Sequence, residues 1–179
     1  MQTLKSPITG KLLTPVNLAE GLQAFQCADS GGHYIPAVCY MNWLAKQEAR
    51  LPHLPENSSP HETVLEPSGA RICPETGTLM TRYKVGHGFT FTIDRSITGG
   101  IWLDGGEWEA LRERNFHDEI NLVFTAPWQK QVRDEQAQAT YEERLESALG
   151  ADLVARLQAL RTELADHPHR SLALGYFNE

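Results

Sequence analysis

A short pattern occurs twice in this chain, and it restricts the fold more than any other feature. Ser6-Pro-Ile-Thr-Gly aligns with Cys73-Pro-Glu-Thr-Gly, and after a one-residue gap Gly31-Gly32 aligns with Gly99-Gly100. The same alignment places Tyr34 on Trp102. Shared turn residues and shared apolar positions at matching offsets indicate an internal repeat. We therefore expect two similar units, each with a glycine pair that closes a tight turn.

The second copy continues from its glycine pair into Ile101-Trp-Leu-Asp-Gly-Gly-Glu. This run resembles the end of a bacterial TFIIB-type zinc ribbon, in which two cysteine-bearing turns and two short strands precede a Trp-Leu-Asp run that opens a helix. The resemblance implies four ligand positions in each copy. They are occupied by Ser6, Thr9, Cys27 and Ser30 in the first copy and by Cys73, Thr76, Arg95 and Thr98 in the second.

Each copy thus keeps a single cysteine, whereas a structural zinc site needs four thiolate or imidazole ligands. We expect tandem degenerate ribbons without metal or other cofactor. Each copy also has four bulky aromatic residues, whose burial would replace the stabilisation that zinc supplies. These are Phe25, Tyr34, Tyr40 and Trp43 in the first copy and Phe89, Phe91, Trp102 and Trp108 in the second.

The predicted fold class is α+β, with two small β-rich, zinc-ribbon-like modules, each followed by a helix, and a C-terminal helical segment. The expected divisions are residues 1–50, a linker at 51–69, residues 70–115 and residues 116–179. The linker stretch is rich in proline and lacks hydrophobic periodicity. The first module helix should begin near Pro36 and end near Arg50. Asp104 and Glu107 have the spacing of a capping box at the start of the second module helix.

The C-terminal third reads as three helices. Thr125-Ala126-Pro127 predicts a helix start, and Gly150 predicts its end. A second helix, from about Asp152 to Asp166, places four leucines on one stripe at spacings of four, three and four residues, which is ordinary amphipathic patterning. A short helix over residues 170–177 should follow the break at His167-Pro168.

The charge balance disfavours nucleic acid as a partner. The 179 residues include 23 Asp and Glu against 16 Lys and Arg, a net charge of −7. Sequence-independent binding to nucleic acid depends on Lys and Arg replacing counterions on phosphate.

No apolar run reaches the length of about 18 residues that a membrane-spanning helix needs. Three cysteines without close spacing, and a start that lacks the apolar segment of a secretory signal, favour reduced thiols in the cytoplasm.

Several site hypotheses remain open. Cys27, His33 and Cys39 are close enough in sequence for a partial zinc site, and Cys73 with His87 could form a second one. The simpler interpretation is that these cysteines are small buried side chains. The segment Arg82-Tyr83-Lys84 is the basic-aromatic cluster that a nucleic-acid accessory protein of the ribbon type would use. No nucleophile elbow, phosphate loop or metalloprotease motif indicates an enzyme.

By elimination, the sequence favours a non-catalytic interaction or regulatory module that binds a protein partner or a second copy of itself. The polar helix that follows Pro127 is one expected contact region, because a helix that is polar on most faces either bridges solvent or serves as a docking surface. The residues expected at the interaction surface are Arg82, Tyr83, Lys84, Trp128 and Arg133.

Overall fold

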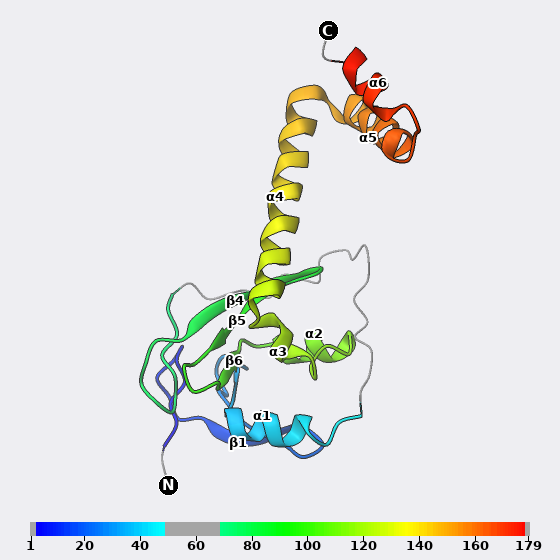
Figure 1. The fold of residues 1–179 in the computed structure, drawn as a ribbon. Coiled ribbons are helices and arrows are strands. Elements are labelled where there is room, and N and C mark those ends of the chain that lie inside the picture. Colours follow the sequence, from blue (N-terminus) through cyan, green and yellow to red (C-terminus); the bar gives the residue numbers. More distant parts are fainter. Residues whose placement is uncertain (1–2, 49–68, 178–179) are drawn as a thin grey trace. The chain divides into compact units, whose positions relative to one another are not determined.

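Six short strands from both halves of the chain form one antiparallel sheet (Figure 1). The structure is a computed structural model that describes residues 3–48 and 69–177. The sheet order is β1-β2-β3-β6-β5-β4, so the described strands of the two halves complete one sheet rather than two separate modules. The α+β class is confirmed. The strands are β1 (Thr14–Ala19), β2 (Leu22–Gln26), β3 (His33–Ile35), β4 (Thr81–Gly86), β5 (Phe89–Arg95) and β6 (Ile101–Leu103).

Backbone hydrogen bonds recur in the two halves at the positions that the repeat aligns. The Ser6 N–H donates to the Lys11 carbonyl at 2.8 Å, and the Cys73 N–H donates to the Thr78 carbonyl at 2.8 Å. In each half a hairpin follows, β1–β2 in the first and β4–β5 in the second. The halves meet where β3 pairs with β6, with Tyr34 directly opposite Trp102.

Three helices pack on one face of the sheet through a shared hydrophobic core (Figure 1). They are α1 (Ala37–Leu44), α2 (Glu107–Glu113) and α3 (Ile120–Val123). Because side chains alternate along a strand, every second strand residue points into this core. The largest fully buried members of the core include Tyr40, Phe91, Trp108, Phe116, Ile35, Ile93, Leu103 and Leu111.

Two helix predictions need correction. The first module helix begins at Ala37, as expected after Pro36, but it ends at Leu44, and Arg50 lies outside the described residues. All of the predicted 51–69 linker except Gly69 also lies outside them. The predicted capping box forms only in part, because the Asp104 N–H donates to Glu107 Oε2 at 2.7 Å while the Asp104 carboxylate has other partners.

The C-terminal helices are α4 (Ala126–Leu149), α5 (Ala151–Ala165) and α6 (Arg170–Tyr176). Thr125 caps α4, since its Oγ1 accepts the Trp128 N–H at 3.4 Å. Contacts divide the chain into two units after Val132. We call residues up to Val132 the sheet unit and residues from Arg133 onward the helical unit. The first turns of α4 belong to the sheet unit.

Gly86 explains how the start of α4 fits onto the sheet. It adopts a positive φ of 70° at the end of the β4–β5 hairpin. A Cβ atom at this position would lie 2.4 Å from Val132 Cγ2, which is too close for any side chain. The missing side chain therefore lets Val132 pack against the hairpin, where it is buried.

Candidate interaction surface

The four positions of the first half that the zinc-ribbon resemblance assigns to ligands are linked by local hydrogen bonds. Ser6 Oγ accepts the N–H groups of Ile8 and Thr9 at 3.2 and 3.3 Å. Thr9 Oγ1 lies 3.4 Å from Cys27 Sγ, and Ser30 Oγ accepts the Gly32 N–H. Burial raises the pKa of the Cys27 thiol, but hydrogen bonds from Ser30, Ser6 and Thr9 outweigh it and lower the pKa to about 6.

In the second half, the position that corresponds to Cys27 lies one residue away from the one assigned from the sequence. The Cys27 N–H donates to the Gly32 carbonyl, and in the second half the corresponding bond runs from the Ser96 N–H to the Gly100 carbonyl. This turn is one residue shorter, so Ser96, and not Arg95, corresponds to Cys27. Arg95 instead places its guanidinium over the ring of Phe124, 4.7 Å from the centroid.

The remaining hydroxyl groups of the second half also bond to one another. Thr76 Oγ1 lies 2.7 Å from Thr78 Oγ1, and Ser96 Oγ lies 2.9 Å from Thr98 Oγ1. Burial raises the pKa of the Cys73 thiol, and hydrogen bonds from Thr76 and Tyr34 more than offset this and lower it. Short local hydrogen bonds of this kind stabilise a tight turn.

Tyr34 and Trp102 join the two halves between these turns. Each lies over the second glycine of the other half, since a Cβ at Gly100 would lie 2.0 Å from Tyr34 Oη and a Cβ at Gly32 would lie 2.5 Å from Trp102 Cζ2. The Tyr34 hydroxyl donates to Glu75 Oε2 at 2.7 Å. Together with Cys27, Cys73 and other apolar residues, the two rings form a second buried cluster. The glycine pairs therefore make room for aromatic rings as well as turning the chain.

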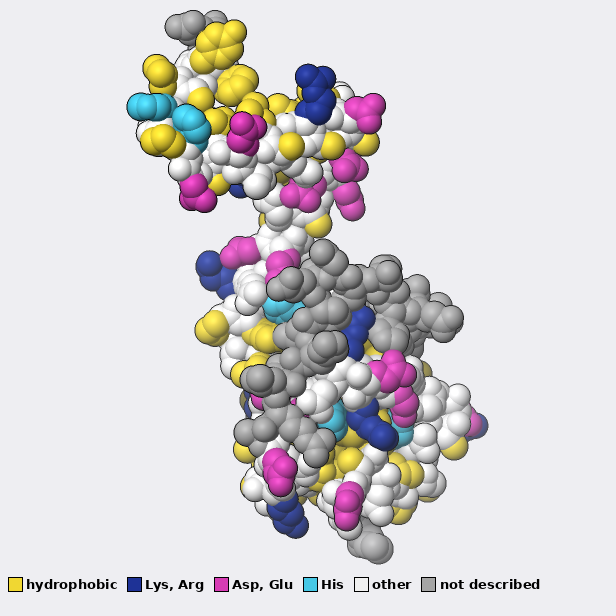
Figure 2. All heavy atoms as spheres, turned by 90° about the vertical axis from the view of Figure 1, so that its right-hand side faces the viewer, with side chains coloured by type: hydrophobic (Ala, Val, Ile, Leu, Met, Phe, Trp, Pro, Cys, Tyr) yellow, Lys and Arg dark blue, Asp and Glu magenta, His cyan; other side chains and the backbone are white. Residues whose placement is uncertain are grey.

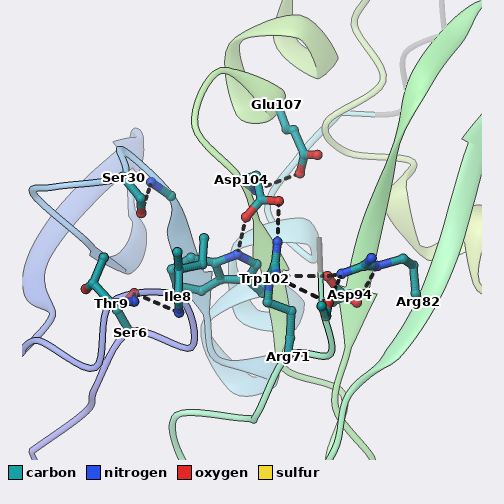
Figure 3. Close-up of polar contacts among 12 residues, drawn as sticks. Ser6, Ile8, Thr9, Ser30, Arg71, Arg82, Asp94, Trp102, Asp104 and Glu107 are labelled. Carbon is teal, nitrogen blue, oxygen red and sulfur yellow. Dashed lines mark hydrogen bonds and ion pairs between the residues drawn. The ribbon is translucent and has the colours of Figure 1, made fainter. Parts of the chain in front are cut away.

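A buried ion network lies beside Trp102 (Figure 3). No sequence motif indicated it. Arg71 Nη2 donates to Asp104 Oδ2 at 2.9 Å, and Asp104 Oδ1 accepts the indole N–H of Trp102 at 2.7 Å. Asp94, opposite Trp102 in the sheet, pairs with Arg82 at 3.2 Å. Burial raises the pKa of Asp94, although the charges of Arg82 and Arg71 oppose this shift.

The proposed partial metal sites are not assembled. Within residues 3–48 and 69–177, no group of three or more His, Cys, Asp or Glu side chains lies close enough together to hold a metal ion. The Cys27 thiol contacts the turns of the first half. The surroundings of Cys39 differ, because burial and the charge of Glu75 raise the pKa of its thiol. Burial lowers the pKa of His33, against the charge of Glu109. His87 packs against Trp128, with ring centroids 4.3 Å apart, at the hairpin end remote from Cys73.

The basic-aromatic cluster does not form one surface. Neighbouring residues of a strand point to opposite faces of the sheet, which separates Tyr83 from Arg82 and Lys84. Tyr83 packs edge-on against Phe124, with ring centroids 5.1 Å apart. Arg82 is paired with Asp94, while Lys84 is exposed.

Trp128 and Arg133, also predicted at the interaction surface, have different surroundings. The Trp128 indole N–H donates to the Val85 carbonyl at 2.8 Å, and its ring stacks on Phe116 with centroids 5.3 Å apart. Trp128 thus attaches the start of α4 to the sheet. Arg133 is exposed at the first position of the helical unit.

The helical unit has an exposed apolar surface that contains a groove between α5 and α6. In Figure 2, hydrophobic side chains gather over these C-terminal helices. The groove has a volume of about 180 Å³ and is rimmed by Arg161 and Arg170. Its apolar lining comes from Leu157, Leu160, Leu164, Leu174 and Phe177. In the sequence, the leucine stripe of α5 is ordinary amphipathic patterning, and only the structure shows that part of it is exposed.

Comparison with known proteins gives no match: no protein-family model, curated protein or solved structure is similar to the chain. The resemblance to zinc ribbons therefore stays a prediction that rests on the quoted residues. None of the helices within the described ranges carries an apolar stretch long enough to cross a membrane.

Proposed function

We propose that this protein is a non-catalytic interaction module that binds another polypeptide chain through the apolar surface of its helical unit. The observation that carries the proposal is the exposure of large apolar side chains there. Leu172 is 78% exposed, Tyr176 is 76% exposed and Phe177 is 59% exposed. Among residues 133–177, Val154 is the one buried hydrophobic side chain. Contiguous apolar surface of this kind is characteristic of protein-binding sites.

The groove between α5 and α6 supports the same conclusion. A cavity of about 150 Å³ accommodates a benzene-sized group, so a groove of about 180 Å³ has room for one bulky apolar side chain of a partner. Arg161 and Arg170 at its rim add positive charge to a unit in which acidic residues predominate. Such a groove fits one apolar anchor side chain on the apolar face of a partner helix.

Nucleic-acid binding is the less favoured function. Lys84 is exposed, but Arg82 is paired with Asp94 and Tyr83 packs on Phe124. This cluster would therefore offer few cations to phosphate, whereas strong salt-dependent binders neutralise about six to ten phosphates.

We also propose a cytoplasmic location, because Cys27, Cys39 and Cys73 are free thiols.

The test compares the partners retained by three immobilised full-length proteins. The first is the wild type, the second carries Leu157→Glu in the groove, and the third carries Leu79→Glu on the sheet unit. Leu79 is a suitable control because it is 63% exposed, more than the 44% of Leu157. We expect a protein, or added soluble copies of this chain, to bind the wild type and the Leu79→Glu variant but not the Leu157→Glu variant. Equal retention by all three proteins would contradict the proposal.

A second measurement addresses nucleic acid directly. Fluorescence anisotropy with single- and double-stranded oligonucleotides should show no binding at micromolar protein near physiological salt, about 0.15 M. Tight binding that weakens with added salt and disappears in a Lys84→Glu variant would favour the nucleic-acid function instead.

A further inference from the structure

The leucine stripe of α5 has the spacing of a coiled-coil seam. Leu153, Leu157, Leu160 and Leu164 are separated by four, three and four residues. This is the alternation of d and a positions in a heptad repeat, which keeps a stripe of knobs facing a partner helix. Leu153 and Leu157 are 41% and 44% exposed, so the seam is incompletely covered within the chain.

The two sides of the seam have different environments. On one side, at the e positions, Val154 is buried and Arg161 lines the groove with α6. On the other side, at the g positions, Arg156 and Glu163 are both exposed. The chain itself therefore covers the e side at Val154, whereas both g residues are open to a partner.

The charges on the g side determine which arrangement of two α5 helices is favourable. In a parallel pair, a g residue meets an e residue of the partner helix, so Arg156 would face Arg161 of the other copy. In an antiparallel pair, g residues meet g residues, so Arg156 of each copy would face Glu163 of the other. Such flanking charges set the orientation of helix pairs. The parallel pair is repulsive, and the antiparallel pair gains two attractive contacts.

We propose that the partner of the helical unit is a second copy of this chain, bound antiparallel along the seam of α5. This inference rests on the proposed function and names its partner. Each copy would lay its leucine stripe along the stripe of the other, next to Leu174 and Phe177 in the groove. Two α5–α6 hairpins then form a four-helix arrangement with twofold symmetry, in which each copy presents the same patch.

A second copy fits this surface better than an unrelated acidic helix. An acidic helix would satisfy Arg161 and Arg170 at the groove, but it would face Glu163 with like charge. A second copy brings a stripe of equal length and a g side that is complementary to itself. The α5 seam covers only about two heptads, so the exposed apolar residues of α6 are needed to complete the interface.

Sedimentation equilibrium of the full-length protein over a range of concentrations tests this proposal. We expect reversible dimers with a dissociation constant on the order of micromolar. Arg156→Glu and Glu163→Arg should each weaken the dimer by roughly tenfold, because each change turns two attractive contacts into repulsive ones. An equimolar mixture of the two variants should form a heterodimer about as stable as the wild-type dimer. Rescue of this kind requires both variants to be folded.

The control is Arg144→Glu, the same charge reversal on an exposed residue of α4, which should leave the dissociation constant unchanged. A wild-type protein that is monomeric at every concentration would overturn the proposal. So would a stronger dimer in the Arg156→Glu variant, which is the result that a parallel pair requires. If the wild type is monomeric but still retains another protein that Leu157→Glu loses, the proposed function stands and this inference fails.

Discussion

The sheet unit and the helical unit differ in how far they bury their apolar side chains. All the buried hydrophobic residues described except Val154 lie in the sheet unit. By contrast, eight of the fifteen exposed large apolar side chains that the structure describes lie between Arg133 and Phe177, a much shorter part of the chain. The sheet unit is therefore stabilised by its own core, whereas the helical unit leaves its large apolar side chains mostly exposed. Stability and binding should consequently respond to different substitutions.

Trp102→Ala should cause the largest loss of stability. Trp102 is 1% exposed, packs between the turns of both halves and donates a hydrogen bond to Asp104. Truncating a buried tryptophan costs about 3–5 kcal/mol, so the free energy of unfolding should fall by that amount in urea denaturation. A loss below about 1 kcal/mol would mean that the sheet unit is not stabilised by this aromatic contact.

Asp104→Ala should be the next largest effect. It leaves the Arg71 guanidinium buried without its closest carboxylate, and it also removes the acceptor of the Trp102 indole. Removing one partner of a buried ion pair costs about 3 kcal/mol or more. The control is Asp29→Ala, which breaks the exposed pair of Asp29 with Lys11 and should cost less than about 1 kcal/mol. Equal losses in the two variants would contradict the role assigned to the buried network.

The Cys27 thiol should make the stability of the sheet unit depend on pH. Its pKa is about 6 in the folded protein against an ordinary value of 9.0. Between these values the unfolded chain binds more protons, so stability rises with pH, with a slope of at most about 1.4 kcal/mol per pH unit. The gain is complete above pH 9 and is lost as the pH falls through 6.

Urea denaturation at several pH values between these limits measures the slope, and Cys27→Ser should reduce it. Some slope should remain in that variant, because the pKa of Cys73 is lowered as well. An unchanged slope in Cys27→Ser would show that the hydrogen-bonded turn does not favour the thiolate.

The sequence predicted the features that depend on local chain geometry. The turns at the glycine pairs and the starts of α1 and α4 follow from short-range signals, and the structure has them at these positions. The pairing of β3 with β6 could not be predicted, because no local pattern specifies which distant strand edge a three-residue strand will join. The helix α3 is too short to show a hydrophobic period.

The candidate site was predicted less well, for a related reason. Trp128 and Tyr83 looked available for binding, but both pack within the sheet unit. Exposure depends on tertiary contacts, which the sequence does not give directly. The leucine stripe of α5 was visible as a pattern, yet the same pattern describes a helix that is buried in a core. A buried core helix and an exposed docking helix share this pattern, and they differ only in what covers the leucines.

The smallest expected effect on stability is that of Leu172→Ser in the helical unit. Leu172 is 78% exposed on α6, so its removal leaves no cavity and uncovers little surface that was hidden from water. Surface substitutions of this kind change the free energy of unfolding by less than about 0.5 kcal/mol. The matched substitution is Leu103→Ser, which replaces a fully buried leucine by a polar residue in the core and should cost several times more. Both are measured by urea denaturation at low protein concentration, where association contributes least to the apparent stability. If Leu172→Ser were as destabilising as Leu103→Ser, the helical unit would have a core of its own, and its apolar residues would no longer indicate a surface kept open for a partner.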